Sequence, residues 1–242
     1  MGVEPLNNFA GMSLPPRSLR EAVVALLRLT RGSPLAKAEE LAEASLLTLE
    51  EASQALENLQ ARGLVGGDFK VSPYQRVQLV LEAVRLGVPL ERACRSLSWG
   101  EFEETVKNAL ELNGYEAIHH LRIRIGGRLS EIDVFAVKGE LALLLDCKHW
   151  RRPLSPSQLR RVVEAQVERL EALKDEENLK VLRLKLGRKN YRKFYVIPVV
   201  VTLLEASHRL VEGVPVVPIS RLPSFLAEAP THFHQLKWVR IE

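Results

Sequence analysis

The chain has little of what marks secreted or membrane-spanning proteins. Its 242 residues include two cysteines, Cys94 and Cys147, which match no metal-binding spacing and are too few for a disulfide framework. No N-terminal stretch combines a basic start, an apolar middle and a small-residue cleavage site, so we expect a cytoplasmic protein. The longest apolar run, residues 194–204, is too short to cross a bilayer and contains Pro198. We therefore interpret it as a buried strand and expect no membrane partner.

The charged residues are unevenly distributed along the chain. The net charge is +4, but residues 1–100 contain eleven Lys and Arg against eleven Asp and Glu, so the positive surplus lies beyond them. Residues 180–193 carry seven basic residues and no acid, which favours contacts with DNA phosphates. A solvated basic connection would have the same composition. The residues that we expect to bind nucleic acid are Arg183, Lys185, Arg188, Lys189, Arg192 and Lys193.

Residues 1–97 are interpreted as an all-helical domain followed by linker helices. Apolar residues at helical spacing predict two helices in its first half. A third helix begins after Thr48, which forms a capping box with Glu51, and it ends at Gly63. Residues 64–72 are interpreted as a two-stranded wing that turns at a Gly-Gly pair. Three helices and a wing in this order resemble a winged helix-turn-helix, a fold often used to bind DNA.

The third predicted helix is acidic, which argues against a DNA-reading role. It carries Glu50, Glu51 and Glu57 against Arg62 alone. A helix that reads the major groove is usually basic or rich in amide side chains at its exposed positions. We therefore favour protein–protein contacts or packing within the chain over DNA reading for this domain.

Residues 98–242 alternate between helical and strand patterns, which predicts an α/β domain with a mixed sheet flanked by helices. The first helix begins at Trp99, with Ser98 as its N-cap. A second helix opens at Ser155 and runs to about Leu173. The predicted strands are 115–125, 130–137, 140–147, 194–203 and 214–218.

Charged residues interrupt the apolar pattern of the predicted hairpin. Residues 138–139 are interpreted as its two-residue turn, because Gly accepts the positive φ that a tight turn needs. This turn places Asp133 opposite Leu144 and Glu131 opposite Asp146. Directly opposed residues, and residues two apart on one strand, point to the same face. The charged residues that share one face are then Glu131, Asp133, Asp146 and Lys148.

Carboxylates at this spacing repel one another unless a cation lies between them. Oxygen ligands indicate a hard divalent ion, Mg²⁺ or Mn²⁺, which favours phosphate-containing substrates. The alternative is a structural ion pair of Asp133 and Asp146 with Lys148 or Arg128. We favour the metal site, because one lysine leaves at least two acids without a partner.

Glu103 is a further candidate, on the helix that begins at Trp99. At about 100° per residue it lies at the edge of the apolar stripe, beside Leu110, and can face a cleft between helix and sheet. Glu101 has an N-terminal capping position and is the weaker candidate. The alternative for Glu103 is an acid that interacts only with the helix dipole.

Several segments together resemble the motifs of the PD-(D/E)xK nuclease superfamily, and most nearly its archaeal Holliday junction resolvases and Mrr-type restriction endonucleases. The resemblance covers residues 98–173 and rests on Phe102-Glu103, NGYEA (113–117), EIDVFA (131–136) and LLLDCKHW (143–150). Gly114 follows Glu103 at a spacing similar to that of the resolvases. Ile132 stands where the superfamily's name has proline, and Glu131 is an extra acid without an assigned role.

The resemblance implies a restriction-endonuclease-like fold and a metal-dependent DNA endonuclease that hydrolyses phosphodiester bonds in duplex, branched or modified DNA. By this likeness Glu103, Asp133 and Asp146 would bind Mg²⁺ or Mn²⁺, and Lys148 would lie beside the attacked phosphate. Gln166 resembles a helical glutamine of several branches and is a further candidate catalytic residue, and Arg169 shares its face. We expect a homodimer, because two sites related by a two-fold axis can cut both strands.

Other histidines are interpreted as ordinary residues. The pairs His119-His120 and His232/His234 lack partner ligands at metal spacing. For His149, which follows the lysine motif, we expect packing or hydrogen bonding rather than catalysis.

Two other functions fit parts of the sequence. A catalytically silent nucleic-acid-binding or assembly module would keep the nuclease fold without turnover. A transcription regulator would act through the helical first domain, which the acidic third helix disfavours.

Overall fold

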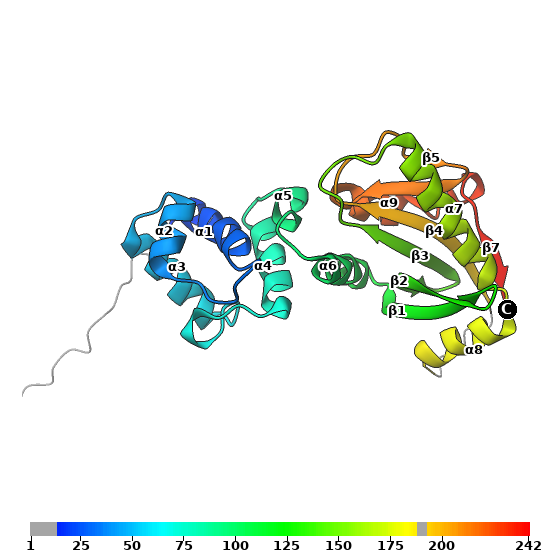
Figure 1. The fold of residues 1–242 in the computed structure, drawn as a ribbon, viewed down its shortest axis with the longest axis horizontal. Helices are drawn as coiled ribbons and strands as arrows, with labels where there is room; N and C mark the ends of the chain where they lie inside the picture. Colours follow the sequence, from blue (N-terminus) through cyan, green and yellow to red (C-terminus); the bar gives the residue numbers. More distant parts are fainter. Residues whose placement is uncertain (1–13, 188–192) are drawn as a thin grey trace, which may run out of the picture. The chain divides into compact units, whose positions relative to one another are not determined.

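The structure is a computed structural model that describes residues 14–187 and 193–242 (Figure 1). The chain divides into two compact units, Met1–Val88 and Pro89–Glu242. The short helix α5 (Leu90–Cys94) therefore belongs to the second unit, whereas the sequence places the boundary after residue 97. No helix in the described part of the chain is both long enough and apolar enough to cross a membrane.

The described part of the first unit is built from helices, as the sequence predicts. The capping box of α3 is present: the Thr48 hydroxyl accepts a hydrogen bond from the Glu51 amide, and the Glu51 side chain accepts from the Thr48 amide. Apolar faces of these helices form the core of the unit. The helices are α1 (Pro16–Leu29), α2 (Ala38–Ser45), α3 (Leu49–Ala61) and α4 (Pro73–Arg85).

The predicted two-stranded wing is wrong. Residues 64–72 contain the short 3₁₀ helix η1 (Gly67–Phe69), and only one isolated β-bridge, Leu35 to Lys70, joins this segment to the rest of the unit. Asp68 and Phe69 have φ angles of 53° and 54°. Residues in the left-handed region are not in the extended conformation of a strand, so Asp68 and Phe69 form part of a tight turn, and the residues on either side of them are not assigned as strands.

The second unit contains a seven-stranded mixed sheet in the order β1-β2-β3-β4-β6-β5, with β7 also paired to β4. The neighbours β1, β2 and β3 run antiparallel, whereas β3, β4 and β6 run parallel. This arrangement confirms the predicted restriction-endonuclease-like α/β fold. The strands are β1 (Glu116–Ile125), β2 (Arg128–Lys138), β3 (Leu141–Lys148), β4 (Phe194–Thr202), β5 (Leu210–Val211), β6 (Val214–Pro218) and β7 (Val239–Ile241).

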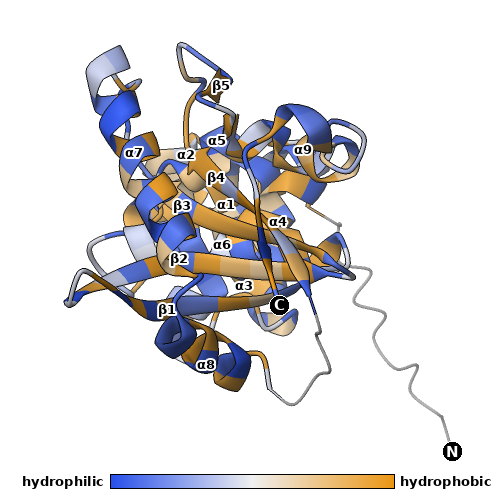
Figure 2. Ribbon diagram, turned by 90° about the vertical axis from the view of Figure 1, so that its right-hand side faces the viewer, coloured by the Kyte–Doolittle hydropathy of each residue, from blue (hydrophilic) through white to orange (hydrophobic). Residues whose placement is uncertain are grey.

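Helices cover both faces of this sheet. Figure 1 shows α6 on one side of β1, β2 and β3, and α7 crossing the other side from β4 towards β1. The central strands are strongly hydrophobic (Figure 2), because residues buried under helices on both faces have little contact with water. The helices of the unit after α5 are α6 (Trp99–Leu112), α7 (Pro156–Ala172), α8 (Glu176–Lys185) and α9 (Leu222–Glu228).

The turn of the β2–β3 hairpin lies one residue later than the sequence indicates. Lys138 pairs with Leu141, so the turn residues are Gly139 and Glu140 rather than Lys138 and Gly139. Gly139 has a φ of 63° and supplies the positive φ from the first turn position instead of the second. The predicted partners are therefore displaced by two residues. A displacement of two preserves the alternation of faces, so the pairing error moves no side chain to the opposite face.

Candidate active site

Three acids from three elements gather at the sheet. Glu103 lies in the second turn of α6, Asp133 on β2 and Asp146 near the end of β3. Burial and the negative charge of Asp133 raise the pKa of Glu103 to about 7. Burial and the negative charge of Asp146 raise the pKa of Asp133 to about 6. Raised values of this kind mean that burial and mutual repulsion outweigh the nearby cations.

Asp133 lies just beyond the last regular backbone pair of the β2–β3 hairpin. The regular pairs of β2 and β3 end at Val134 and Leu145. Beyond that pair, Asp133 Oδ2 accepts a hydrogen bond from the Cys147 backbone amide at 2.6 Å. A side-chain carboxylate thus takes the place of a strand carbonyl and is fixed against β3.

Asp146 is the most buried of the three acids, with 2% of its surface exposed. Its Oδ1 accepts a hydrogen bond from Arg169 Nη1 at 3.2 Å, and its Oδ2 lies 2.7 Å from Lys148 Nζ. The lysine contact is a close charge pair without hydrogen-bond geometry. Among the described residues, Asp146 Oδ2 has no hydrogen-bond partner. Because a buried, unbonded carboxylate oxygen is costly, it is a natural position for a cation ligand.

Lys148 and Glu103 both lie near Trp99, the first residue of α6. Lys148 Nζ lies 5.5 Å from the centre of the Trp99 ring, in the range of a cation–π interaction. The Trp99 side chain acts weakly against the raised pKa of Glu103, of which burial is the main cause. Sequence reasoning missed this role, although the spacing of four residues places Trp99 and Glu103 on one helix face.

Gln166 is fully buried and acts on the site through a neighbour. Its Nε2 donates to the backbone carbonyls of Leu144 on β3 and Val199 on β4, at 2.7 and 3.1 Å. Its Oε1 accepts a hydrogen bond from Arg169 Nη1, the same nitrogen that donates to Asp146. Gln166 therefore fixes α7 on the sheet and orients Arg169, and its own side chain is not exposed to solvent.

His120 and Glu131 lie at the edge of the acid cluster. His120 Nδ1 is 2.8 Å from Glu131 Oε1 and 3.9 Å from Glu103 Oε2. The hydrogen bond to His120 lowers the pKa of Glu131. The sequence treats His120 as an ordinary residue and leaves Glu131 without a role. The contact depends on the pairing of β1 with β2, which places Leu121 opposite Ile132 and which no local pattern predicts.

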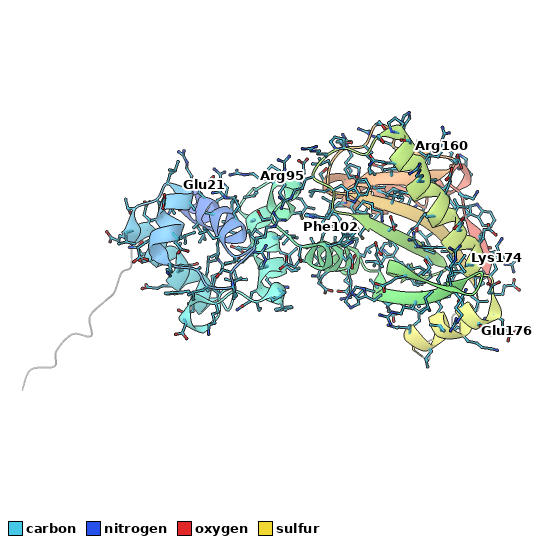
Figure 3. The ribbon with its side chains drawn as sticks, viewed as in Figure 1. Glu21, Arg95, Phe102, Arg160, Lys174 and Glu176 are labelled. Atoms are coloured by element: carbon cyan, nitrogen blue, oxygen red, sulfur yellow. The ribbon has the colours of Figure 1, made fainter. Side chains whose placement is uncertain are left out.

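The histidine after the lysine motif has a packing role, as expected. His149 Nε2 lies 2.9 Å from the Cys94 carbonyl oxygen, and its ring centre is 5.0 Å from that of Phe102. Figure 3 labels Phe102 on α6, where its side chain is fully buried. These contacts join the end of β3 to α5 and α6 and so fix the strand that carries Asp146.

The described basic residues of segment 180–193 contact different parts of the unit. Arg183 hydrogen bonds to the Glu242 carbonyl, and Lys193 pairs with Glu140 at the hairpin turn. Lys185 is close enough to His119 for its charge to lower the pKa of that histidine, after burial as the main cause. The other predicted DNA-binding residues, Arg188, Lys189 and Arg192, lie outside the described residues.

The chemistry of the three acids fits a divalent cation. Carboxylate oxygens are the ligands that Mg²⁺ and Mn²⁺ prefer, and Asp146 Oδ2 is buried without a hydrogen bond. In residues 14–187 and 193–242, however, no three His, Cys, Asp or Glu side chains are arranged closely enough to form a ready metal site. Asp133 Oδ2 and Asp146 Oδ1 already accept hydrogen bonds, from the Cys147 amide and from Arg169.

A comparison with family models agrees with the fold. Residues 94–174 match the family model Mrr_cat, described as a restriction endonuclease, and this segment contains all the candidate acids, Lys148 and Gln166. The match confirms the resemblance to the PD-(D/E)xK superfamily and supports a nuclease-type function. No curated protein matches the chain.

One solved structure is similar to the chain, the crystal structure of protein VC1899 from Vibrio cholerae. The two chains are 14% identical, and the TM-score is 0.32. The similarity covers 90% of this chain and 56% of that one, so this chain spans little more than half of its length.

Proposed function

We propose that the second unit, a restriction-endonuclease-like domain of the PD-(D/E)xK type, is a divalent-metal-dependent endodeoxyribonuclease. One observation carries the proposal: burial and neighbouring carboxylates raise the pKa values of Glu103 and Asp133, which share the site with Asp146 and Lys148. Among the described residues, Asp146 Oδ2 is also buried without a hydrogen bond. Lys148 and Arg169 pair with Asp146, but this ion pair does not offset the raised pKa values of Glu103 and Asp133.

Glu103, Asp133 and Asp146 would hold Mg²⁺ or Mn²⁺. When bound, such an ion polarises a phosphate oxygen and lowers the pKa of a coordinated water. The protein's own part is to hold the three carboxylates near one another. Burial and mutual repulsion raise the pKa values of Glu103 and Asp133, and a bound cation would offset this repulsion.

Lys148 would interact with the scissile phosphate. Its side chain is 16% exposed, so the ammonium can reach a substrate while its stem is shielded by Trp99. A positive charge at this position stabilises the negative charge that develops on the phosphate as the P–O bond breaks. Arg169 stays on Asp146 and keeps that carboxylate oriented towards the site.

DNA is the proposed substrate because the positive surplus of the chain lies in the second unit, the unit that carries the acid cluster. Cutting both strands of a duplex or branched DNA is simplest with two sites, so we also propose a homodimer.

The test is a cleavage assay on duplex DNA, four-way junctions, single-stranded DNA and RNA, each with Mg²⁺, Mn²⁺ or chelator. Asp146→Asn and Lys148→Ala should lose cleavage and keep the fold, as judged by circular dichroism. Glu104→Gln is the matched control, because Glu104 neighbours Glu103 in sequence but pairs with Lys107. Unchanged cleavage by both site variants would overturn the proposal.

A catalytically silent nucleic-acid-binding module is the second candidate. It is favoured by the close pairing of Asp146 with both Lys148 and Arg169 and by the lack of a ready metal site among the described residues. This candidate predicts salt-dependent DNA binding without turnover on any substrate of the panel. Calorimetric titration with Mn²⁺ separates the two, since only the nuclease binds the ion with residues of the acid cluster.

A further inference from the structure

The backbone of β1 is distorted at one residue. His120 has a φ of 53°, in the left-handed region, although it lies in the middle of a ten-residue strand. The flanking residues are regularly paired, His119 with Val134 and Leu121 with Ile132, so the distortion is confined to the position facing Asp133. A residue with a Cβ atom adopts this conformation at a cost, and such residues cluster at functional sites.

The distortion brings two neighbouring imidazoles together. In a regular strand, consecutive side chains point to opposite faces. Here the ring centres of His119 and His120 are only 4.5 Å apart, and both rings meet acids of α6. His119 Nδ1 lies 3.4 Å from Glu104, and His120 Nδ1 lies 3.9 Å from Glu103. The left-handed residue therefore turns the second imidazole towards the helix that carries Glu103.

Glu103 is consequently approached from the sheet. His120 Nδ1 comes within 3.9 Å of its carboxylate from β1 and is itself fixed by Glu131 on β2, at 2.8 Å. Glu131, the acid without an assigned role, thus orients the histidine.

We infer that His120 is a positioning residue for Glu103, and that the strained backbone of β1 exists to place its imidazole between Glu103 and Glu131. The inference rests on the proposed function, because it assigns His120 to the support of a cation ligand. Loss of the imidazole leaves Glu103 free to leave the position that it shares with Asp133. Partners of metal ligands of this kind typically contribute about 10- to 100-fold to metal affinity or activity.

The decisive variant is His120→Gly. Glycine adopts the left-handed region without strain and lacks the imidazole. We expect the urea midpoint of His120→Gly to equal or exceed that of the wild type, while the affinity for Mn²⁺ alone, measured by calorimetry, falls about tenfold. A residue that serves only the fold would show the opposite pattern, a lower midpoint with unchanged Mn²⁺ affinity.

Glu212→Gly is the matched control. Glu212 has a φ of 52°, is exposed and lies in the turn between β5 and β6 of the same unit. Relief of its strain should likewise keep or raise the urea midpoint, with no change in Mn²⁺ affinity. Glu131→Gln should reduce the affinity less than His120→Gly, because it loosens the histidine without removing it.

The possible results distinguish failure of this inference from failure of the proposed function. A wild type that fails to bind Mn²⁺ would overturn the proposed function and this inference with it. A wild type that binds Mn²⁺, together with a His120→Gly variant of equal affinity, would overturn the inference alone. A variant with unchanged Mn²⁺ affinity and a raised KM for DNA would also overturn it, because His120 would then contact the substrate and not support Glu103.

Discussion

The two units of the chain bury charge in different ways. In the first unit, the buried Arg76 donates to the Leu27 carbonyl at 2.9 Å and to the Thr30 hydroxyl at 2.5 Å, and the buried Glu82 pairs with Arg62 at 2.7 Å. Both buried side chains there have polar or charged partners. In the second unit, Asp146 is likewise paired, with Lys148 and Arg169. Glu103 and Asp133 differ, because burial and a neighbouring carboxylate raise the pKa of each.

This contrast separates structural from functional charge. A buried charge whose hydrogen-bond and ion-pair partners are all present has a structural role. Removing one partner leaves the other group buried and unpaired, which carries a large desolvation penalty. Buried charges of one sign that remain poorly compensated lower the stability of the fold, and they are retained where a ligand supplies the missing charge. The predictions below test whether the two units divide in this way.

The largest expected effect is on cleavage. Lys148→Ala should reduce the rate constant for DNA cleavage by about 100-fold or more, because a positive charge beside the reacting phosphate is lost. The measurement is single-turnover cleavage of the best substrate in the panel. Arg85→Ala in the first unit, which removes an exposed cation, should leave the rate unchanged. A rate for Lys148→Ala within a factor of two of the wild type would contradict the assignment.

A buried charge of the first unit should matter for stability alone. Arg76→Met should lower the free energy of unfolding by about 1–3 kcal/mol, because the Leu27 carbonyl and the Thr30 hydroxyl lose their donor. Urea titration measures this loss, and the cleavage rate below the transition should not change. Loss of cleavage in a folded Arg76→Met variant would mean that the first unit takes part in the reaction.

Removal of the acidic charge of Glu103 in the second unit should instead stabilise the metal-free protein. The pKa of Glu103 is raised to about 7 in the folded chain, so folded protein binds more protons than unfolded protein between about pH 4.5 and 7. Metal-free stability should therefore fall as the pH rises through this window. Glu103→Gln should remove much of this fall and stabilise the metal-free protein at pH 8 by on the order of 1–2 kcal/mol.

Urea titrations of wild type and Glu103→Gln at pH 5 and pH 8 measure this difference. Saturating Mn²⁺ should raise the stability of the wild type at pH 8 and leave Glu103→Gln nearly unchanged. If the free energies of unfolding of the two proteins changed equally between pH 5 and pH 8, the charge of Glu103 would be compensated within the fold.

The smallest effect is expected at Trp99. Trp99→Phe keeps an aromatic ring beside Lys148 but removes the indole N–H, a polar group one turn before Glu103 whose loss should cost the metal site about 1 kcal/mol. Mn²⁺ affinity should fall by about fivefold in calorimetry. Trp238→Phe, whose ring stacks on Phe233 and not at the site, serves as the control. Equal Mn²⁺ affinities of the wild type and Trp99→Phe would show that Trp99 shields Lys148 and does not support Glu103.

Local signals predicted the fold well. The helices that begin after Thr48, Ser98 and Ser155 all have the capping boxes that their sequences favour, because a capping box needs only four consecutive residues. Alternation along β2 and β3 was enough to bring Asp133 and Asp146 together, even though the turn was placed one residue early.

The missing parts depend on contacts between distant segments. The wing failed because two residues, Asp68 and Phe69, adopt positive φ angles that are uncommon without glycine. His120 was missed because its role arises from the register of β1 on β2 and from the position of α6. Arg169 shared a predicted helix face with Gln166, but only the packing of α7 on the sheet shows which of the two contacts Asp146.

The most direct test of the central claim is a calorimetric titration of Mn²⁺ into the metal-free wild type and into Asp133→Asn at neutral pH. If the acids of α6, β2 and β3 share a divalent cation, the wild type will show saturable binding and Asp133→Asn will bind at least about tenfold more weakly. Equal binding by the two proteins, or no binding by either, would contradict the account.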